Sequence, residues 1–579
     1  MRGPFSSSTP AGAIGATAVG SVDNEMYPMI LVPGKYISAS GADDEFGWMP
    51  GTLTNISNGI YPLYALSYNT SIEDDACHDP PLTGDLSEFI ILIRRGGCSF
   101  NRKAGNAAAR GAKHVLFYNS EPGVDKVNVY APGMESAGMV PEYQGKAWIN
   151  QLRAGLNVYL SITPPEYAGR TLMEEPNSLT GGYMSTFSSW GPSFEARNKP
   201  QISAPGGLIA STYPLNKGGY AVLSGTSMSC PFVAGAIALI LEARGKLYPE
   251  EINSLLSSTA EPTTFHDGKR RHTYLAPIAQ QGGGLINVHN AVHATTLLNV
   301  SDISFNDTEH LPQMTGFTIK NTGPNAVTYE IGHTPSATFY TFRHGGSRST
   351  FEKGQPPDML HLSADLAFSV SEATVQPDES ISIRVSPKAP SGLTSSRTPV
   401  YGGYITINST DGESLSLPYS GVDSLLRNAP ILNRKHVYLS STIRPGYPWA
   451  SNYRFPLPPP NSTRAKYPNI LAPAVYIEMV MGSPLLRIDI QPAGRSHRFK
   501  YNTTTVLGEE ILGAMSGFPS NYVPSAPIQG GWHGQMADGS YAPPGNYTFL
   551  VRALKIFGDP EREEDYESVR TDPFGIWYG

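Results

Sequence analysis

Residues 224–235 read Ser224-Gly225-Thr226-Ser227-Met228-Ser229-Cys230-Pro231-Phe232-Val233-Ala234-Gly235, a tight turn that opens an apolar run ending at Ala243. The run predicts a buried helix, whose first turn leaves backbone N–H groups unpaired at the positive end of the helix dipole. A serine hydroxyl reacts when such a turn fixes it beside a base, with N–H groups waiting for the developing oxyanion. Ser227 is therefore a candidate nucleophile with its own amide as one oxyanion donor; an ordinary helix N-cap is the alternative. The pattern is not the Gly-x-Ser-x-Gly elbow, because its last position is Ser229.

This segment closely resembles the nucleophile motif of subtilisin-like serine proteases. Two upstream blocks, Met184 to Pro192 and Lys199 to Gly206, resemble the strand and loop that precede the nucleophile helix in that family. The resemblance implies an α/β catalytic domain built on a parallel sheet. It also implies that Ser227 is the nucleophile, that Gly225 and Thr226 shape its turn, and that Phe232 takes a packing position where the family commonly has histidine.

The family's catalytic aspartate and histidine are missing from the sequence. Its Asp-Ser/Thr-Gly and His-Gly-Thr-His motifs precede an oxyanion asparagine, and the residues Gly3 to Pro10 resemble the segment that directly follows that asparagine. The nearest substitutes, Asp423 and His344, follow Ser227 and fall in a region of predicted strands, so we interpret them as turn or surface residues. Loss of the serine or histidine in subtilisin lowers turnover on the order of a millionfold. We therefore expect an amino-terminally truncated protease that is inactive as given; the alternative is a pseudoprotease that serves as an extracellular binding protein.

Residues 25–169, with a core at about 50–165, form a predicted α+β insertion in the catalytic domain, which itself comprises residues 1–24 and 170–297. The core holds an apolar strand from Phe89 to Ile93, a glycine turn, an alanine-rich helix ending at Gly111, and a second strand ending at Tyr118. The stretch from Arg95 to Ala112 resembles the protease-associated domain of large subtilases. Cys77 and Cys98 both lie here, and we predict a disulfide between them; two free buried thiols are the alternative.

The chain after Leu298 is predicted to be all-β. Short alternating runs, such as Ile381 to Val385 and Tyr404 to Ile407, are separated by Gly, Pro and Asn turns. Residues 298–424 are similar to the fibronectin-type-III-like module of large subtilases, and residues 425–579 are predicted to form a second β domain. The run Pro456 to Pro460 cannot lie in a central strand, and it is either a linker or a loop.

Composition favours an extracellular protein, and the family resemblance implies protein or peptide substrates. The 42 basic and 49 acidic residues leave a net charge of −7 without long blocks of one sign, which argues against nucleic-acid or membrane-surface partners. The longest apolar stretch, Cys230 to Ala243, is too short to span a bilayer, and no signal peptide opens the chain, so the amino terminus looks cut. Eight Asn-x-Ser/Thr sequons predict glycosylation in the secretory route, at Asn55, Asn69, Asn299, Asn306, Asn408, Asn461, Asn502 and Asn546.

Serine acyl chemistry requires no cofactor. The family resemblance implies that structural calcium can be bound. No loop rich in Asp and Asn identifies its ligands in this sequence, so we predict no metal site. We expect a monomer, and association with the cell surface is compatible with the sequence.

Overall fold

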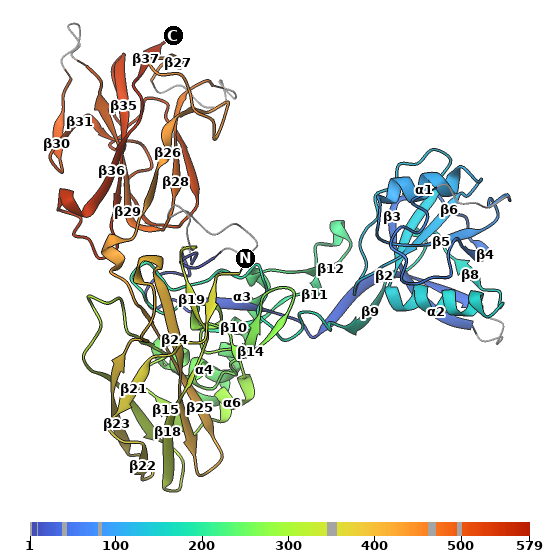
Figure 1. Cartoon of the computed structure of the whole chain (residues 1–579), viewed down its shortest axis with the longest axis horizontal. Coiled ribbons are helices and arrows are strands. Elements are labelled where there is room, and N and C mark those ends of the chain that lie inside the picture. The colour runs from blue at the N-terminus through green and yellow to red at the C-terminus, as the bar shows by residue number, and fades with distance from the viewer. Residues whose placement is uncertain are drawn as a thin grey trace. The chain divides into compact units, whose positions relative to one another are not determined.

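The computed structural model describes residues 3–7, 10–37, 43–78, 84–343, 356–460, 470–494 and 501–579. The chain divides into two compact units, one made of residues 23–182 and 206–228 and the other of residues 1–22, 183–205 and 229–579 (Figure 1). Each unit is therefore assembled from segments that are far apart in the sequence.

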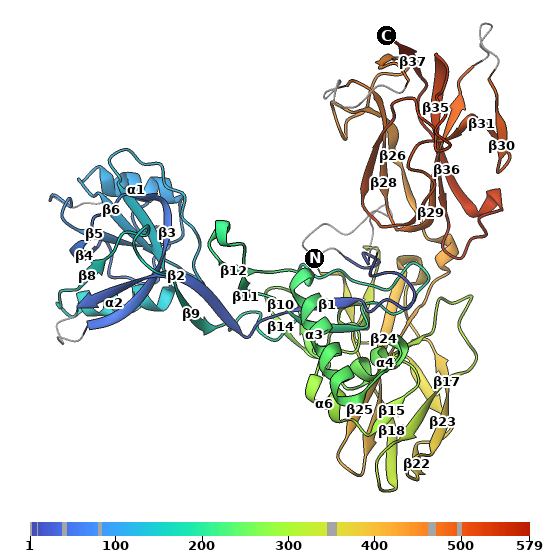
Figure 2. The same cartoon turned by 180° about the vertical axis from the view of Figure 1, so that it is seen from behind.

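The first unit contains the insertion, a mixed sheet with a helix on each face (Figure 2). In the strand Ile90–Arg94, Ile91 and Ile93 pack on one side with Ala104 and Ala107 of the first helix, whereas Ile90 and Leu92 pack on the other side with residues of the second helix. A run of consecutive apolar residues is what a strand covered on both faces requires. The helices are α1 (Phe100–Ala108) and α2 (Glu142–Arg153), and the strands in spatial order are β3 (Asp43–Thr54), β7 (Ser136–Val140), β6 (His114–Tyr118), β5 (Ile90–Arg94), β4 (Gly59–Ala65), β8 (Tyr159–Ile162), β2 (Met26–Ile37) and β9 (Thr171–Pro176).

A two-stranded ribbon carries the chain into and out of the insertion. The first half of β2 pairs antiparallel with β9, from Met26 opposite Pro176 to Leu31 opposite Thr171. At its base the Asn177 amide donates to the Glu25 carbonyl at 2.7 Å, and the Asn24 amide donates to the Gly207 carbonyl at 3.0 Å. The same unit includes the hairpin of β11 (Ile209–Thr212) and β12 (Tyr220–Leu223), which leads to the candidate nucleophile.

The part of the second unit that the sequence predicts to be peptidase-like consists of residues 1–22, 183–205 and 229–295, and is here called the peptidase-like segment. Its described residues contain few strands and helices. Strand β1 (Val19–Asp23) pairs with β10 (Ile202–Gly207) in a two-stranded sheet, and the larger parallel sheet that we expected is absent from the described residues. The run of small residues from Ala11 to Val22 predicts a buried strand. This prediction is wrong in its first half, because turns occupy residues 10–15 and regular strand begins only at Val19. The remaining elements are α3 (Thr226–Arg244), α4 (Pro249–Ser258), β13 (Thr264–His266), β14 (Arg271–Leu275), α5 (Ile278–Gln281) and α6 (Val288–His293).

Helix α3 corrects the prediction of a buried helix. It buries a single stripe of side chains, Ser229, Val233, Ala236 and Ile240, at the spacing of one helix face. The rest of its apolar surface is open: Phe232 is 47% exposed and Leu239 is 54% exposed. The sequence is apolar around the whole helix, so periodicity alone could not indicate that neighbouring elements cover only one side.

Residues 296–422 form a two-sheet sandwich with a closed core. Alternating side chains such as Phe317 and Ile383, which lie opposite each other on neighbouring strands, point into it together with Ile405 and Leu417 of the other sheet. One sheet contains β15 (Thr296–Leu298), β17 (Thr315–Asn321), β23 (Ser380–Lys388) and β21 (Asp365–Phe368). The other contains β16 (Ile303–Ser304), β25 (Ser414–Val422), β24 (Pro399–Ser409), β18 (Val327–Pro335) and β22 (Glu372–Val375), with β19 (Thr338–Tyr340) and β20 (Met359–Leu360) beside β24.

The last region is a second β domain around Trp532, which is 1% exposed. Pro456 lies in its edge strand β27, so the proline-rich run belongs to this domain and is not an interdomain linker. One sheet contains β26 (Leu432–Ser441), β28 (Pro473–Met479) and β34 (Pro527–Gly531). A larger sheet contains β27 (Arg454–Leu457), β37 (Phe574–Tyr578), β35 (Gly545–Leu554), β29 (Ser483–Pro492), β32 (Gly513–Ala514), β33 (Ser520–Val523) and β36 (Tyr566–Arg570), and β30 (Thr504–Val506) pairs with β31 (Glu509–Ile511).

Candidate active site

The turn before α3 is held in place by hydrogen bonds to the end of β10 and to the residue that follows it. The Gly225 amide donates to the Gly206 carbonyl at 2.8 Å, and the Leu208 amide donates to the Ser224 hydroxyl at 2.9 Å. Leu208 itself has a left-handed backbone with φ of 59°, a conformation that a branched residue adopts only when its surroundings impose it. These contacts fix the loop that presents Ser227.

Ser227 is exposed in the first turn of α3. Its backbone N–H has no acceptor among the described residues, because the first hydrogen bond of the turn runs from the Met228 amide to the Gly225 carbonyl, at 2.9 Å. A free amide at a helix start can donate a hydrogen bond to an oxyanion. When the neighbouring hydroxyl attacks a carbonyl group, this amide can stabilise the negative charge on the carbonyl oxygen. Gly225 and Thr226 precede Ser227 directly in this turn.

No base accompanies this hydroxyl. We find no hydrogen bond between Ser227 and a histidine or carboxylate in the described part of the chain. Asp423 lies at the end of β25, where its carboxylate accepts a hydrogen bond from the Ser395 hydroxyl at 3.2 Å. His344 falls outside the described residues. Among the described residues, the turn therefore presents an exposed hydroxyl and an unpaired amide at Ser227, without a histidine or carboxylate hydrogen-bonded to that hydroxyl.

The upstream blocks and the opening residues of the chain lie against one another. The Ser185 amide donates to the Ser21 carbonyl at 2.8 Å, and their two hydroxyls are 2.9 Å apart. The Ser6 amide donates to the Trp190 carbonyl at 2.8 Å, and the Trp190 amide donates to the Ser6 hydroxyl at 3.0 Å. Two motifs that the sequence identifies separately, Met184 to Pro192 and Gly3 to Pro10, are thus brought together.

Lys199 is a feature that sequence reasoning treated only as part of a motif. Its side chain is buried, and its ammonium donates to the carbonyls of Ala13 and Ala16 at 3.0 and 2.9 Å and to the Gln201 amide oxygen at 3.1 Å. Burial lowers the pKa of Lys199 to about 8. The lysine thus pins the turn-rich segment that precedes β1.

Other predicted site residues lie away from the turn. Cys77 and Cys98 are joined by a disulfide in the insertion, with 5.8 Å between their Cα atoms. Six sequon asparagines are exposed and Asn306 is half-buried, whereas Asn461 lies outside the described residues; the exposed ones are Asn55, Asn69, Asn299, Asn408, Asn502 and Asn546.

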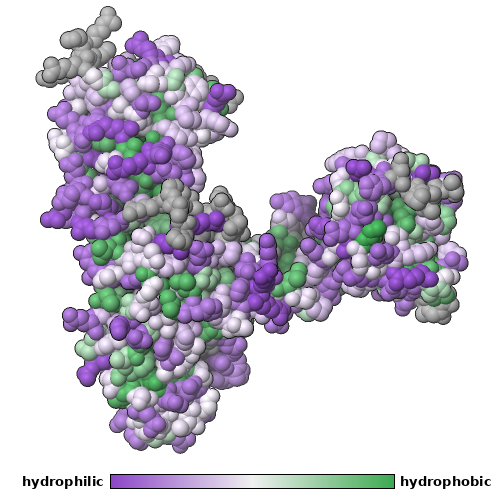
Figure 3. Space-filling view, in the orientation of Figure 1, coloured by the Kyte–Doolittle hydropathy of each residue, from purple (hydrophilic) through white to green (hydrophobic). Residues whose placement is uncertain are grey.

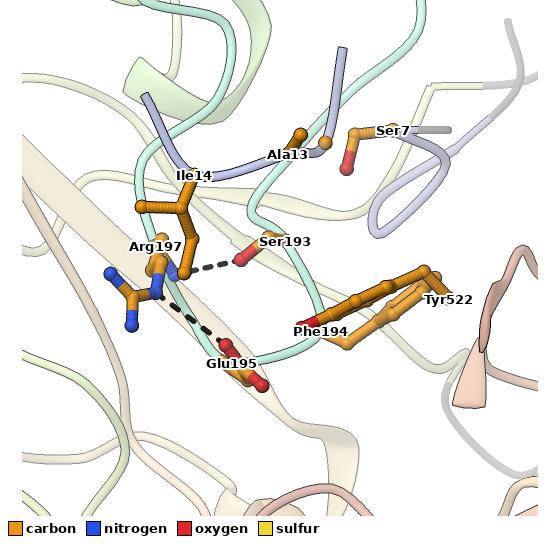
Figure 4. Close-up of a pocket in the computed structure, with 9 residues that line it drawn as sticks. Ser7, Ala13, Ile14, Ser193, Phe194, Glu195, Arg197 and Tyr522 are labelled. Carbon is orange, nitrogen blue, oxygen red and sulfur yellow. Dashed lines mark hydrogen bonds and ion pairs between the residues drawn. The ribbon is translucent and has the colours of Figure 1, made fainter. Parts of the chain in front are cut away.

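We also searched the described residues for metal-ligand clusters and for pockets with catalytic groups. The described residues contain no cluster of three or more His, Cys, Asp or Glu that could hold a metal ion. A pocket of 210 Å³ is walled mainly by Ile14, Phe194 and Tyr522 (Figure 4), and its charged groups, Arg197 and Glu195, are paired with each other at 3.5 Å. Ser7, Ser193 and Glu195 also line this pocket, and among the described residues no hydrogen bond joins either hydroxyl to the carboxylate.

Helix α3 is longer than the apolar run considered in the sequence. Its 19 residues make it long and apolar enough to cross a membrane, by length and composition alone. Core helices of soluble proteins can be equally long and apolar, so this property does not decide whether α3 is a membrane span or a core helix.

Comparison with known proteins identifies two regions. Residues 5–284 match the model of the subtilase family, and residues 303–420 match that of an Fn3-like domain. The chain is 31% identical over 227 residues to the minor extracellular protease Vpr of Bacillus subtilis (38% of this chain, 26% of the relative). It is 25% identical over 450 residues to the PI-type proteinase of Lactococcus lactis (71% of this chain, 22% of the relative). It is 28% identical over 315 residues to a C5a peptidase of Streptococcus pyogenes (52% of this chain, 25% of the relative).

The chain thus spans about a quarter of the length of the curated relatives that it matches, between 22% and 26%. Among solved structures, an aminopeptidase from Aneurinibacillus aligns with 27% of this chain and 37% of its own at 21% identity, with a TM-score of 0.18. That score is too low to bear on the fold.

Proposed function

We propose that residues 3–297 of this chain, with the inserted domain, belong to a secreted subtilisin-like serine endopeptidase that cleaves peptide bonds through an acyl-enzyme. The observation that carries the proposal is the exposed Ser227 hydroxyl beside an unpaired amide at a helix start, inside the segment that matches the subtilase model. Every helix start leaves its first amides unpaired, but a helix N-cap precedes the first helical residue, whereas Ser227 is the second residue of α3.

The chemistry assigned to Ser227 has two steps. Its oxygen attacks the carbonyl carbon of the scissile bond while a base takes the hydroxyl proton, and the Ser227 N–H donates to the resulting oxyanion. The carbon–nitrogen bond then breaks, the amine leaves with that proton, and an ester to Ser227 remains. Water attacks the ester in the same way and releases the acid and the free serine. These steps need no cofactor.

The base is the part that this sequence does not provide. Neither the family's aspartate motif nor its histidine motif occurs in the 579 residues. We therefore expect the chain by itself to be inert toward peptide substrates. Binding without catalysis, through the inserted and β domains, is the function that would remain to a pseudoprotease.

A fluorophosphonate probe, which labels only activated serines, tests the proposal. The 579-residue chain should not be labelled. The genomic sequence upstream of Met1 should be read for in-frame aspartate and histidine motifs, and the protein that includes them should be labelled at Ser227. Labelling should vanish in Ser227→Ala and persist in the matched variant Ser229→Ala, whose side chain is buried. An extended protein with both motifs that resists the probe, or that is labelled at another serine, would refute the proposed nucleophile.

Secretion and glycosylation are part of the proposal. The exposed sequon asparagines could accept a glycan without unfolding the chain, whereas Asn306, half-buried and hydrogen-bonded to the His310 carbonyl at 3.2 Å, is a poorer acceptor. Peptide mapping after expression in a eukaryotic secretory system should find occupied sites among the exposed set. Structural calcium, which family resemblance implies, has no ligand set that we can name among the described residues.

A further inference from the structure

A groove of 390 Å³ lies in the first unit, between the ribbon strand β2 and the hairpin that leads to the nucleophile turn. It is large enough to accept a ligand group rather than a single water. Its walls come from β2, β3, one loop of the insertion and the β11–β12 hairpin: Tyr27, Pro28, Met29, Ile30, Met49, Val124, Leu208, Tyr220, Ala221, Val222 and Ser224.

Most of the side chains that line the groove are apolar, although polar atoms make up nearly half of its exposed surface. Met29 is buried at 3% exposure, whereas Met49 and Val222 are half-buried and reach the groove from opposite sides. Methionine side chains adapt their shape to apolar groups of different outline. Such a lining suits a large aliphatic or aromatic side chain more than a compact polar one.

The charged groups near the groove are mostly acidic. The Tyr27 ring packs against Gly123, where an added Cβ would come within 2.2 Å of it. Its pKa is raised by burial and by the nearby carboxylates of Asp125 and Glu175, with Arg95 opposing them. An acidic side chain entering the groove would therefore be repelled as well as desolvated.

The groove lies close to the candidate active site along the chain. Ser224 lines it and also accepts the hydrogen bond from Leu208, another wall residue, that anchors the nucleophile turn. Ser227 is three residues further along the chain, so its Cα lies at most about 10 Å from that of Ser224. An extended peptide advances about 3.3 Å per residue and crosses this distance in about three residues.

We propose that this groove is a substrate subsite, which takes a large apolar side chain, such as Leu, Met or Phe, from a residue within about three positions of the bond that Ser227 attacks. The inserted domain thereby contributes half of a specificity pocket. The inference rests on the proposed function, because only a nucleophile at Ser227 makes a groove beside it a substrate subsite.

Photo-crosslinking on the 579-residue chain tests this without requiring catalysis. The probe is a Gly-Ser peptide that carries one photo-leucine, and its crosslinks are mapped by peptide mass spectrometry. We expect them in residues 27–30, at Met49 and in residues 220–224. Excess of the same peptide with Leu in place of photo-leucine should compete, and the peptide with Asp there should compete at least about tenfold less well, as expected for the loss of one buried leucine.

Val222→Asp should remove most of these crosslinks, and Met49→Asp should do the same from the other wall. Leu223→Asp is the matched control, since Leu223 is the next residue of the same strand, is 40% exposed and does not line the groove. It should leave the crosslinks unchanged. Crosslinks spread over exposed apolar residues such as Phe232 and Leu239, and indifferent to Val222→Asp, would overturn the inference.

The two proposals can fail separately. Crosslinks confined to the groove, together with an extended protein that resists the fluorophosphonate probe, would leave a peptide-binding groove without a protease. Labelling of Ser227 in the extended protein, with no groove-specific crosslinks, would leave the protease and remove the subsite.

Discussion

The sandwich of residues 296–422 and the peptidase-like segment contain similarly apolar elements, yet only the first is closed. In the sandwich two sheets cover each other, and Ile405 and Leu417 are fully buried. In the peptidase-like segment a two-stranded sheet and a few helices leave Phe232 and Leu239 of α3 open to solvent. In the view of Figure 3, apolar residues are scattered among hydrophilic ones on the face of the inserted domain. Apolar composition therefore predicts burial only where the partner surface is also present.

The largest effect should come from the closed core. Ile405→Ala removes a fully buried side chain and leaves a cavity between the sheets, so it should lower the free energy of unfolding of the sandwich by about 4 kcal/mol. Hydrogen exchange of peptides from β24 and β25 measures this locally. Val370→Ala, at a side chain that is 36% exposed, is the control and should change exchange little. Equal effects of the two variants would mean that the sandwich core is not closed.

The inserted domain should depend on a crosslink as well as on its two-faced core. Replacing Cys77 and Cys98 with serine should destabilise it by about 3 kcal/mol, because the bridge closes a loop between residues 21 positions apart. Limited proteolysis should then cut within the insertion and spare the β domains. Cys230→Ser, at the free exposed cysteine, should have no such effect. An unchanged cleavage pattern in the double variant would contradict the expected role of the bridge.

Replacing Lys199 tests how much its hydrogen bonds stabilise the peptidase-like segment, in which β1 and β10 form only a two-stranded sheet. Lys199→Met leaves the Ala13 and Ala16 carbonyls without their donor, which should cost about 2 kcal/mol and speed exchange in residues 10–22. Burial lowers the pKa of Lys199 to about 8 from 10.5, so between these values the unfolded chain binds more protons than the folded one. The stability contributed by the lysine therefore rises with pH through this window and is constant below it.

The difference in the free energy of unfolding between the wild type and Lys199→Met should accordingly increase as the pH rises from 8 toward 10.5. The control is Lys246→Met, which replaces an exposed lysine and should change the free energy of unfolding little. A difference that decreases over this window would show that the buried lysine has the opposite pKa shift.

The smallest effect on stability is expected on the open face of α3. Leu239→Ser should change the free energy of unfolding by less than about 0.5 kcal/mol, because the side chain is 54% exposed. It should lower the binding of an apolar dye to the folded chain, since it removes accessible apolar surface. Val233→Ser, on the buried stripe of the same helix, should instead destabilise the segment. A destabilising Leu239→Ser would indicate that this face is covered in solution.

The sequence was informative where local pattern decides the structure. The Gly-Thr turn placed Ser227 at a helix start, and continuous apolar runs placed β5 and β6 in the insertion. It failed where distant residues decide: the predicted strand at Ala11 becomes a turn whose carbonyls at Ala13 and Ala16 bind Lys199, almost two hundred positions away. The groove beside the turn was not foreseen for the same reason, because Met49 and Val222 meet only through folding.

The ribbon of β2 and β9 has a consequence for how such a chain is assembled. Since Asn24 and Asn177 are hydrogen-bonded at its base, with the Asn177 side-chain amide 3.0 Å from the Asn24 carbonyl, a domain of some hundred and fifty residues departs and returns at one point. The host pays little loop-closure entropy for such a guest once the guest is folded, because its two ends are already side by side. A domain attached in this way can be gained, exchanged or removed in evolution without a change in the backbone conformation of the flanking segments.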